Sequence, residues 1–360
     1  MSKERYSVIT GTGSYLPEKR VANEDFLGFE FYESNGKKIE KDNAYIIDKF
    51  KEITTIEERR YVTDDLVTSD IAFFAAESAI KNAGIDAETL DYIIVAHNFG
   101  DVKAGTNRTD MVPALASRVK HKLKIKNPDC VAYDLPFGCP GWLQGMIQAD
   151  YFIKSGDAQK ILVIGAETIS RVIDLHDRDS MIYADGAGAT ILEGRESEAP
   201  TGILAHKTRS DTYRYAEMLT MGCSYNVTPE NEADLYLKMN GRRLYQYALE
   251  TVPLSIKACL DKAGLGIEKV SKVLIHQANG KMDDAIIQRL YKLYGQDEVP
   301  EGVMPMIISW IGNSSVATVP TLLDLILKGS VENQKINPGD VVVFASVGAG
   351  MNINAAVYQF

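Results

Sequence analysis

Cys139 is the residue whose surroundings in this sequence best suit covalent chemistry. It lies within YDLPFGCPGW, residues 133–142, between a run typical of a strand and a run typical of a helix. A thiol at a helix start faces free backbone N–H groups and the positive end of the helix dipole, and both favour the thiolate. The flanking glycines allow a tight turn, and Pro140 suits a first helical turn. We therefore predict that Cys139 is a nucleophile. The other cysteines are interpreted as ordinary structural thiols: Cys130, Cys223 and Cys259.

Two further polar residues follow apolar runs. His276 comes directly after KVLI, residues 272–275, and Asn313 follows MPMIISW, residues 304–310, which we interpret as a strand. Because ligands in α/β sheets bind beyond the carboxyl ends of strands, we expect Cys139, His276 and Asn313 to share one cleft. The remaining histidines are interpreted as ordinary polar residues: His97, His121, His176 and His206.

Two glycine-rich segments complete the candidate site. They are YADGAGAT, residues 183–190, and SVGAGMN, residues 346–352. Neither fits the spacing of a phosphate-binding loop. A glycine-rich strand end close to a thiolate is instead suited to offer a backbone N–H to an oxyanion.

The elements that must position these residues form a pattern that occurs twice. Helix-period segments alternate with short Val- and Ile-rich runs, which predicts an α/β protein with mostly parallel, buried strands. Residues 75–98 match residues 254–279 in layout, and residues 139–167 match residues 313–350. Two matches in the same order favour an internal duplication. We place its halves at 1–198, with the cysteine, and 199–360, with the histidine and the asparagine.

Bulk properties narrow the class of protein. The 360 residues include 39 Lys and Arg against 49 Asp and Glu, so the formal net charge is −10. Without a basic stripe to neutralise phosphates, a nucleic-acid partner is disfavoured. The opening segment lacks the apolar core of a signal peptide, and no run reaches the length of a membrane span, so we expect a cytoplasmic protein without a membrane partner. No CxxC pair and no His at metal-ligand spacing occurs, so neither a disulfide framework nor a metal site is expected.

Taken together, these motifs resemble those of the β-ketoacyl-acyl-carrier-protein synthase III family of the thiolase superfamily, over essentially the whole chain. The segments that carry the resemblance are IEERRYV at 56–62, the turn at Cys139, YADGAGAT at 183–190, HQAN at 276–279, GNSSVATVP at 312–320 and GAGMNINAAVYQF at 348–360. The resemblance implies a duplicated, five-layered αβαβα fold of the thiolase type. It also implies a homodimer in which a narrow tunnel leads to the thiol.

The resemblance further implies an acyltransferase of fatty acid biosynthesis. Cys139 would take an acyl group from a thioester, and the backbone N–H groups of Cys139 and Ala349 would form the oxyanion hole. His276 and Asn313 would hold the thioester carbonyl of malonyl-acyl-carrier protein while carbon dioxide leaves, and the carbanion would then attack the acyl group on Cys139. The implied partner is an acyl-carrier protein. No cofactor is implied beyond the coenzyme A or carrier thioesters that serve as substrates.

The other site residues are assigned by resemblance as well. Residues expected near the substrate are Val112, Phe137, Arg171, Asn279, Gly348 and Gly350. Residues expected to dock the carrier protein are Lys281 and Arg289, with Arg171 as a further candidate.

Two departures from the family pattern bear on the substrate. The Trp and Arg that hold coenzyme A in typical members are missing from residues 44–55, and Val112 stands where a Phe often closes the acyl pocket. We therefore expect an acyl donor larger than acetyl. Several alternatives stay open: a specialised condensing enzyme for alkyl-resorcinol, quinolone or polyketide-like products, and, with less support, a head-to-head acyl condenser, a non-catalytic subunit or a thioester hydrolase.

Overall fold

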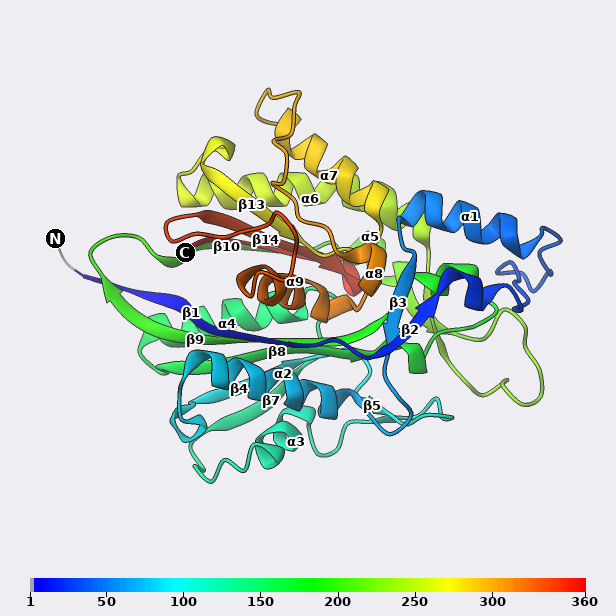
Figure 1. The fold of residues 1–360 in the computed structure, drawn as a ribbon, viewed down its shortest axis with the longest axis horizontal. Coiled ribbons are helices and arrows are strands. Elements are labelled where there is room, and N and C mark those ends of the chain that lie inside the picture. The colour runs from blue at the N-terminus through cyan, green and yellow to red at the C-terminus, as the bar shows by residue number, and fades with distance from the viewer. Residues whose placement is uncertain (1–2) are drawn as a thin grey trace.

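Two β-sheets alternate with three layers of helices in the chain, whose residues 3–360 are described by a computed structural model (Figure 1). The first sheet has the order β1 (Glu4–Tyr15), β9 (Asp185–Ser197), β8 (Lys160–Thr168), β4 (Tyr92–Ala96) and β7 (Val131–Leu135). The second has the order β10 (Gly202–Ser210), β15 (Asn352–Gln359), β14 (Val341–Gly348) and β13 (Val270–Ile275).

The helices occupy the space between the sheets and both outer faces. The central pair is α4 (Gly141–Ser155) and α9 (Thr318–Leu327); the outer pairs are α2 (Thr68–Ala83) with α3 (Leu115–Lys122) and α6 (Gly241–Ala263) with α7 (Gly280–Lys292). The central helices are almost wholly buried, because each packs apolar side chains against both sheets. This arrangement confirms the predicted five-layered α/β fold.

Smaller elements lie around this framework. They are the pair β2 (Lys19–Ala22) and β3 (Glu58–Tyr61), the pair β5 (Asp101–Val102) and β6 (Thr109–Asp110), the pair β11 (Leu219–Gly222) and β12 (Tyr236–Met239), and the helices α1 (Asn43–Thr54), α5 (Thr212–Tyr215) and α8 (Ile308–Ile311). Helix α1 packs beside α7 at one end of the molecule. No helix among residues 3–360 combines the length and the apolar character that crossing a membrane requires.

The expectation of mostly parallel strands is wrong. Only β4 with β7, β4 with β8, and β13 with β14 pair in parallel in the two sheets, whereas the other neighbours run antiparallel. The reason is clearest at β14 and β15, which are joined by the short 3-10 turn Ala349–Met351. A connection that short can only reverse the chain, since a parallel pair needs a long crossover. Buried antiparallel strands are as apolar as parallel ones, so composition did not distinguish them.

The two sheets repeat one strand order, apart from β7. The order β1-β9-β8-β4 matches β10-β15-β14-β13, and the strands of the two sheets fall on either side of residues 198–199. This placement supports the proposed halves. The predicted strand at residues 304–310 is wrong, because the segment ends in helix α8. The side chain of Gln277 accepts hydrogen bonds from the backbone N–H groups of Ile307 and Ile308, so that a side chain occupies donors that a sheet would otherwise bind.

Candidate active site

Cys139 lies between the end of β7 and the start of α4, as predicted. Gly138 has a positive φ of 69°, and its carbonyl accepts the N–H of Gly141 at 3.0 Å, which closes the turn around the cysteine. Helix α4 begins at Gly141 with Pro140 as its N-cap. The Cys139 side chain remains partly accessible, and its sulfur accepts a hydrogen bond from the Ser315 hydroxyl at 3.2 Å.

The turn after β14 packs directly against Cys139. A Cβ atom added to Gly348 would lie 2.6 Å from the Cys139 backbone nitrogen, and one added to Gly138 would lie 2.9 Å from the Ala349 nitrogen. Only glycine allows backbones to approach this closely. The structure therefore brings the backbone N–H groups of Cys139 and Ala349 to one place beside the thiol.

Burial acts against the thiolate that the helix start favours at Cys139. Burial raises the pKa of the Cys139 thiol to about 11, and the Glu167 carboxylate, when charged, acts in the same direction. The Ser315 hydroxyl and the residue's own N–H lower this pKa but do not outweigh burial. Cys139 is therefore a thiol at neutral pH, and sequence reasoning weighed the helix end without the desolvation.

Asn313 is held in a turn between α8 and α9. Its backbone pairs with the segment before β9, where its N–H donates to the Ile182 carbonyl at 2.9 Å and its carbonyl accepts from Ala184 at 2.8 Å. Its side-chain oxygen accepts the N–H of Ser315 at 2.8 Å. With that oxygen engaged, the amide nitrogen is the atom that Asn313 can offer as a donor.

His276 follows β13 and is fully buried. Its Nδ1 lies 2.7 Å from the hydroxyl of Thr318, and Thr318 donates its single proton to the Ser315 carbonyl at 2.8 Å. While Thr318 donates to Ser315, Nδ1 carries the imidazole proton and Nε2 has a free lone pair; when Thr318 donates to Nδ1 instead, the proton lies on Nε2. Burial lowers the pKa of His276 to about 4, so the ring is neutral at pH 7.

Residues that sequence reasoning missed form a second layer around the thiol. Glu167 is the penultimate residue of β8, and its Oε1 accepts both the backbone N–H of Asn98 at 2.6 Å and the side-chain N–H at 2.5 Å. The same Asn98 amide lies 3.2 Å from the Ser315 hydroxyl. Burial raises the pKa of Glu167 to about 8, and its Oε2 has no hydrogen-bond partner among residues 3–360. The available signal was that Asn98 and Glu167 lie at carboxyl ends of adjacent strands.

The segment 183–190 has a different role from the predicted one. Most of it lies within β9, whose glycines face helix α9: a Cβ added to Gly188 would lie 2.7 Å from Pro320, and one added to Gly186 would lie 3.4 Å from Ser314. Gly188 therefore lets helix α9 approach the first sheet closely, whereas Gly186 meets Ser314 at an ordinary contact distance. The other glycine-rich segment, residues 346–352, is the one that packs against Cys139.

A cavity of about 540 Å³ opens between α1, the 3-10 helix Arg178–Ile182 and the starts of α6 and α7. Its inner wall includes Ile182, which bonds to Asn313, and Asn279, which caps α7 by accepting the N–H of Met282. Its charged lining side chains are Lys41, Lys49, Arg178, Asp179 and Arg242. Four of these five are basic, which contrasts with the acidic balance of the whole chain.

The remaining predicted site residues lie in different parts of the molecule. Lys281 is exposed beside the cavity, 3.5 Å from Glu52 of α1, and Arg289 reaches the Leu249 carbonyl of α6. Arg171 instead turns to Thr63 and Asp64, with its side chain 11% exposed, and it does not line the cavity. Phe137 is half-buried just before Gly138, and Gly350 has a positive φ of 76° in the turn after β14.

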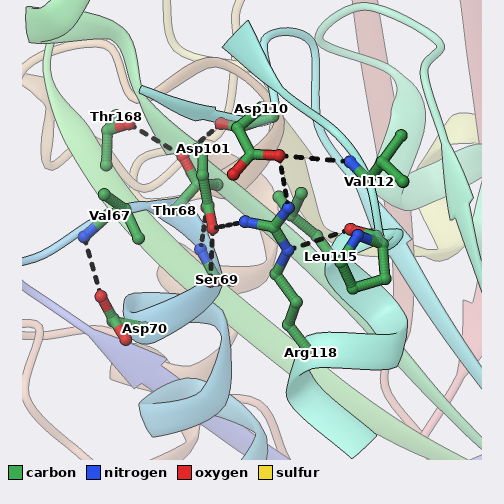
Figure 2. A network of polar contacts seen from close by, with 12 residues as sticks. Val67, Thr68, Ser69, Asp70, Asp101, Asp110, Val112, Leu115, Arg118 and Thr168 are labelled. Carbon is green, nitrogen blue, oxygen red and sulfur yellow. Dashed lines mark hydrogen bonds and ion pairs between the residues drawn. The ribbon is translucent and has the colours of Figure 1, made fainter. Parts of the chain in front are cut away.

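Val112 lies in the loop between β6 and α3, and ion pairs between side chains hold the base of this loop (Figure 2). The Arg118 guanidinium donates to Asp101 at 2.6 Å, to Asp110 at 2.7 Å and to the carbonyl of the residue after Val112 at 2.9 Å. Asp101 in turn accepts two hydrogen bonds from Ser69 of α2. Val112 is 87% exposed, so this apolar residue faces the outside of the single chain.

Comparison with known proteins agrees with this geometry. The family models for 3-Oxoacyl-[acyl-carrier-protein (ACP)] synthase III and for its C-terminal part match residues 133–212 and 260–360. The chain is 31% identical over 364 residues to a β-ketoacyl-[acyl-carrier-protein] synthase III of Xanthomonas campestris, with all of both chains covered. The crystal structure of a 3-oxoacyl-[acyl-carrier-protein] synthase III from Aquifex aeolicus matches with a TM-score of 0.77 and 28% identity, over 98% of this chain and 100% of the other. A priming β-ketosynthase of the R1128 polyketide pathway matches with a TM-score of 0.81 and 26% identity, over 100% and 98%.

The buried Glu167 predicts a specific dependence of stability on pH. Its folded-state pKa is raised, so its contribution to stability is complete below the unfolded value of about 4.5 and is lost as the pH rises through about 8. Between these limits, the free energy of unfolding of wild type should fall by roughly 3–5 kcal/mol relative to Glu167→Gln, which does not ionise. Denaturant unfolding across this range measures the difference. Glu40→Gln, at an exposed position, is the control, and parallel curves for wild type and Glu167→Gln would contradict the assignment.

Proposed function

Since the chain belongs to the 3-oxoacyl-[acyl-carrier-protein] synthase III family and is a condensing acyltransferase, we propose that it joins an acyl thioester to malonyl-acyl-carrier protein with loss of carbon dioxide, in fatty acid biosynthesis. The observation that carries this proposal is the convergence of Cys139, His276 and Asn313 on one turn, residues 313–318. A nucleophile beside two neutral polar groups suits covalent capture followed by carbanion chemistry.

In the first half-reaction, the Cys139 sulfur attacks the carbonyl carbon of the acyl donor. The bond from that carbon to the donor sulfur breaks, the acyl group stays on Cys139, and the proton lost by Cys139 ends on the departing thiol. The neighbouring backbone N–H groups of Cys139 and Ala349 support a role as oxyanion hole, because fixed donors stabilise the negative oxygen of the tetrahedral intermediate.

In the second half-reaction, His276 and Asn313 bind the thioester oxygen of malonyl-carrier protein. Carbon dioxide leaves, the enolate carbon attacks the acyl group on Cys139, and a 3-ketoacyl thioester and the Cys139 thiolate result; one proton restores the thiol. A donor role for His276 requires its proton on Nε2, so the Thr318 hydroxyl must turn from the Ser315 carbonyl to Nδ1. The low pKa of His276 keeps the ring neutral in either tautomer.

The basic cavity supports docking of an acidic carrier protein. Its inner wall reaches Asn313 through Ile182, so a flexible thioester arm entering there would approach the reacting groups. Lys41, Lys49, Arg178 and Arg242 line the opening, and Lys281 and Arg289 remain proposed contacts beyond it. Because the whole chain carries a net charge of −10, such a local basic surface is needed to attract an acidic partner.

The Val112 loop supports a homodimer with an enlarged acyl pocket. An exposed apolar residue in a loop held by ion pairs suits insertion into a partner subunit, and a valine there fills less space than a phenylalanine. Each additional methylene buried is worth about 0.8 kcal/mol, so two or three extra carbons shift preference at least tenfold. The same feature, with the likeness to the R1128 priming ketosynthase, favours a specialised condensing enzyme as the second candidate.

The covalent role of Cys139 is tested by intact mass after incubation with a panel of acyl thioesters. Wild type and a Cys223→Ser control should gain one acyl group, and Cys139→Ala should gain none. His276→Ala and Asn313→Ala should still be acylated, whereas their decarboxylation of malonyl-carrier protein should slow by about 10²–10³-fold. Acylation of Cys139→Ala, or equal loss of both half-reactions in the other two variants, would contradict these roles.

The docking surface is tested by charge reversal at the cavity opening. The double variant Lys49→Glu, Arg242→Glu should raise KM for malonyl-carrier protein about tenfold or more and weaken its dependence on salt, because the attraction is electrostatic. Lys281→Glu with Arg289→Glu tests the outer contacts in the same assay. The control is Lys126→Glu, an exposed change beyond α3 in the opposite outer layer, which should leave KM unaltered. If the two double variants also leave KM unaltered, this surface does not bind the carrier protein.

The acyl pocket is tested by competition between acetyl and medium-chain donors, each on coenzyme A and on carrier protein. Wild type should prefer the longer chain, and Val112→Phe should shift the preference toward acetyl by about tenfold. A substitution at the base of the same loop, Arg118→Lys, keeps the charge but loses the paired contacts to Asp101 and Asp110. It should reduce the preference for the longer chain without creating a preference for acetyl. A wild-type preference for acetyl-coenzyme A that Val112→Phe leaves unaltered would contradict the enlarged pocket.

A further inference from the structure

Ser315 is in contact with each of the three proposed active-site residues or with a group bound to it. Its backbone N–H donates to the Asn313 side chain at 2.8 Å, and its hydroxyl donates to the Cys139 sulfur at 3.2 Å. Its carbonyl accepts from Thr318, which also meets His276. Backbone atoms make two of these contacts, so any residue in this conformation could keep them. The hydroxyl contact with the sulfur requires the serine itself.

The backbone of Ser315 is strained in a way that points to function. Its φ is +52°, in the left-handed region that residues with a Cβ seldom adopt. Such strain persists where the surrounding structure enforces it, and it concentrates at functional sites. A glycine here would relieve the strain, yet the chain has a serine, whose side chain reaches the nucleophile.

The Asn98 amide leaves the single proton of the Ser315 hydroxyl free for the Cys139 sulfur. The Asn98 side chain has two N–H bonds, and its nitrogen lies 2.5 Å from Glu167 Oε1 and 3.2 Å from Ser315 Oγ. Glu167 also accepts the backbone N–H of Asn98, which fixes the amide in place. With Oγ accepting from Asn98, the single hydroxyl proton of Ser315 is left to point at the Cys139 sulfur.

We propose that Ser315 is a fourth catalytic residue, whose hydroxyl donates a hydrogen bond to the Cys139 sulfur and favours the thiolate that attacks the acyl donor. Asn98 is a positioning residue, because it acts by turning that hydroxyl toward the sulfur, and Glu167 supports Asn98 from behind. The inference rests on the proposed function of Cys139 as the nucleophile. It adds a donor where burial disfavours the charged sulfur, and hydrogen bonds to charged groups are the strong ones.

Two substitutions separate the hydroxyl from the backbone of the turn. Ser315→Ala removes only the oxygen and keeps the Cβ, so the strain at this position is unchanged. Ser315→Gly removes the oxygen and also suits the positive φ, which protects the turn from unfolding. Loss of the thiolate donor should appear in both variants, whereas an effect of backbone strain should differ between them.

The readout is alkylation of Cys139 by iodoacetamide, measured by site-resolved mass spectrometry in a Cys223→Ser background that lacks the exposed thiol. Both Ser315 variants should react about 3- to 10-fold more slowly between pH 7 and 9, because a smaller thiolate fraction outweighs the greater nucleophilicity of a more basic thiol. Asn98→Ala should have a smaller effect of the same sign. The other titratable groups coupled to the thiol, Glu167 and Tyr183, are present in every variant.

The control is Ser255→Ala, which removes a buried serine hydroxyl that bonds within helix α6. It should react like the parent. In the two half-reactions, the Ser315 variants should lose acylation more than decarboxylation of malonyl-carrier protein. Unaltered alkylation rates in both Ser315 variants would overturn the inference. Because iodoacetamide is not a substrate, that result would leave the proposed condensation intact. If alkylation slows as expected but wild type transfers no acyl group, the proposed function fails instead.

Discussion

The left-handed turn at Ser315 is the constraint on which the candidate active site depends. It belongs to the second half of the chain, yet its hydroxyl meets Cys139 of the first half, and its backbone orients Asn313 and Thr318. The contact is possible because β9 has glycine where α9 passes and because Gly348 lets the turn after β14 press against Cys139. The site is thus assembled by close backbone contacts between halves, and a Cβ at any of these glycines would separate its groups.

Burial gives the site a consistent electrostatic character. At neutral pH the Cys139 thiol, the His276 ring and the Glu167 carboxyl are all uncharged, since desolvation disfavours each charged form. Charge then appears only when the reaction creates it, as a thiolate, an oxyanion or an enolate. Backbone N–H groups and the Asn313 amide are then available as neutral donors, and His276 joins them once its proton lies on Nε2.

The outer parts of the molecule serve a different purpose from this uncharged centre. Basic side chains gather at the cavity opening of an otherwise acidic chain, and the loop held by ion pairs presents an apolar Val112 to the outside. The first feature suits the proposed docking of an acidic carrier protein, and the second suits the proposed homodimer. They also bear on the proposed choice of substrate, which Cys139, His276 and Asn313 alone do not specify.

The sequence by itself determined the α/β class, the turn that holds Cys139 and the segments that hold His276 and Asn313, because these depend on local patterns: apolar periodicity, glycine at tight turns and polar residues after buried runs. The five layers followed only from the family resemblance. It did not determine strand direction, the helix before Asn313 or the protonation of Cys139. Each of those depends on what lies across the fold, such as the Gln277 side chain on the backbone of Ile307 or the desolvation of the thiol. Only tertiary structure places Asn98, Glu167 and Ser315 in one hydrogen-bonded row, since they lie far apart along the chain. Such side-chain contacts result from packing, so no spacing pattern in the sequence reveals them.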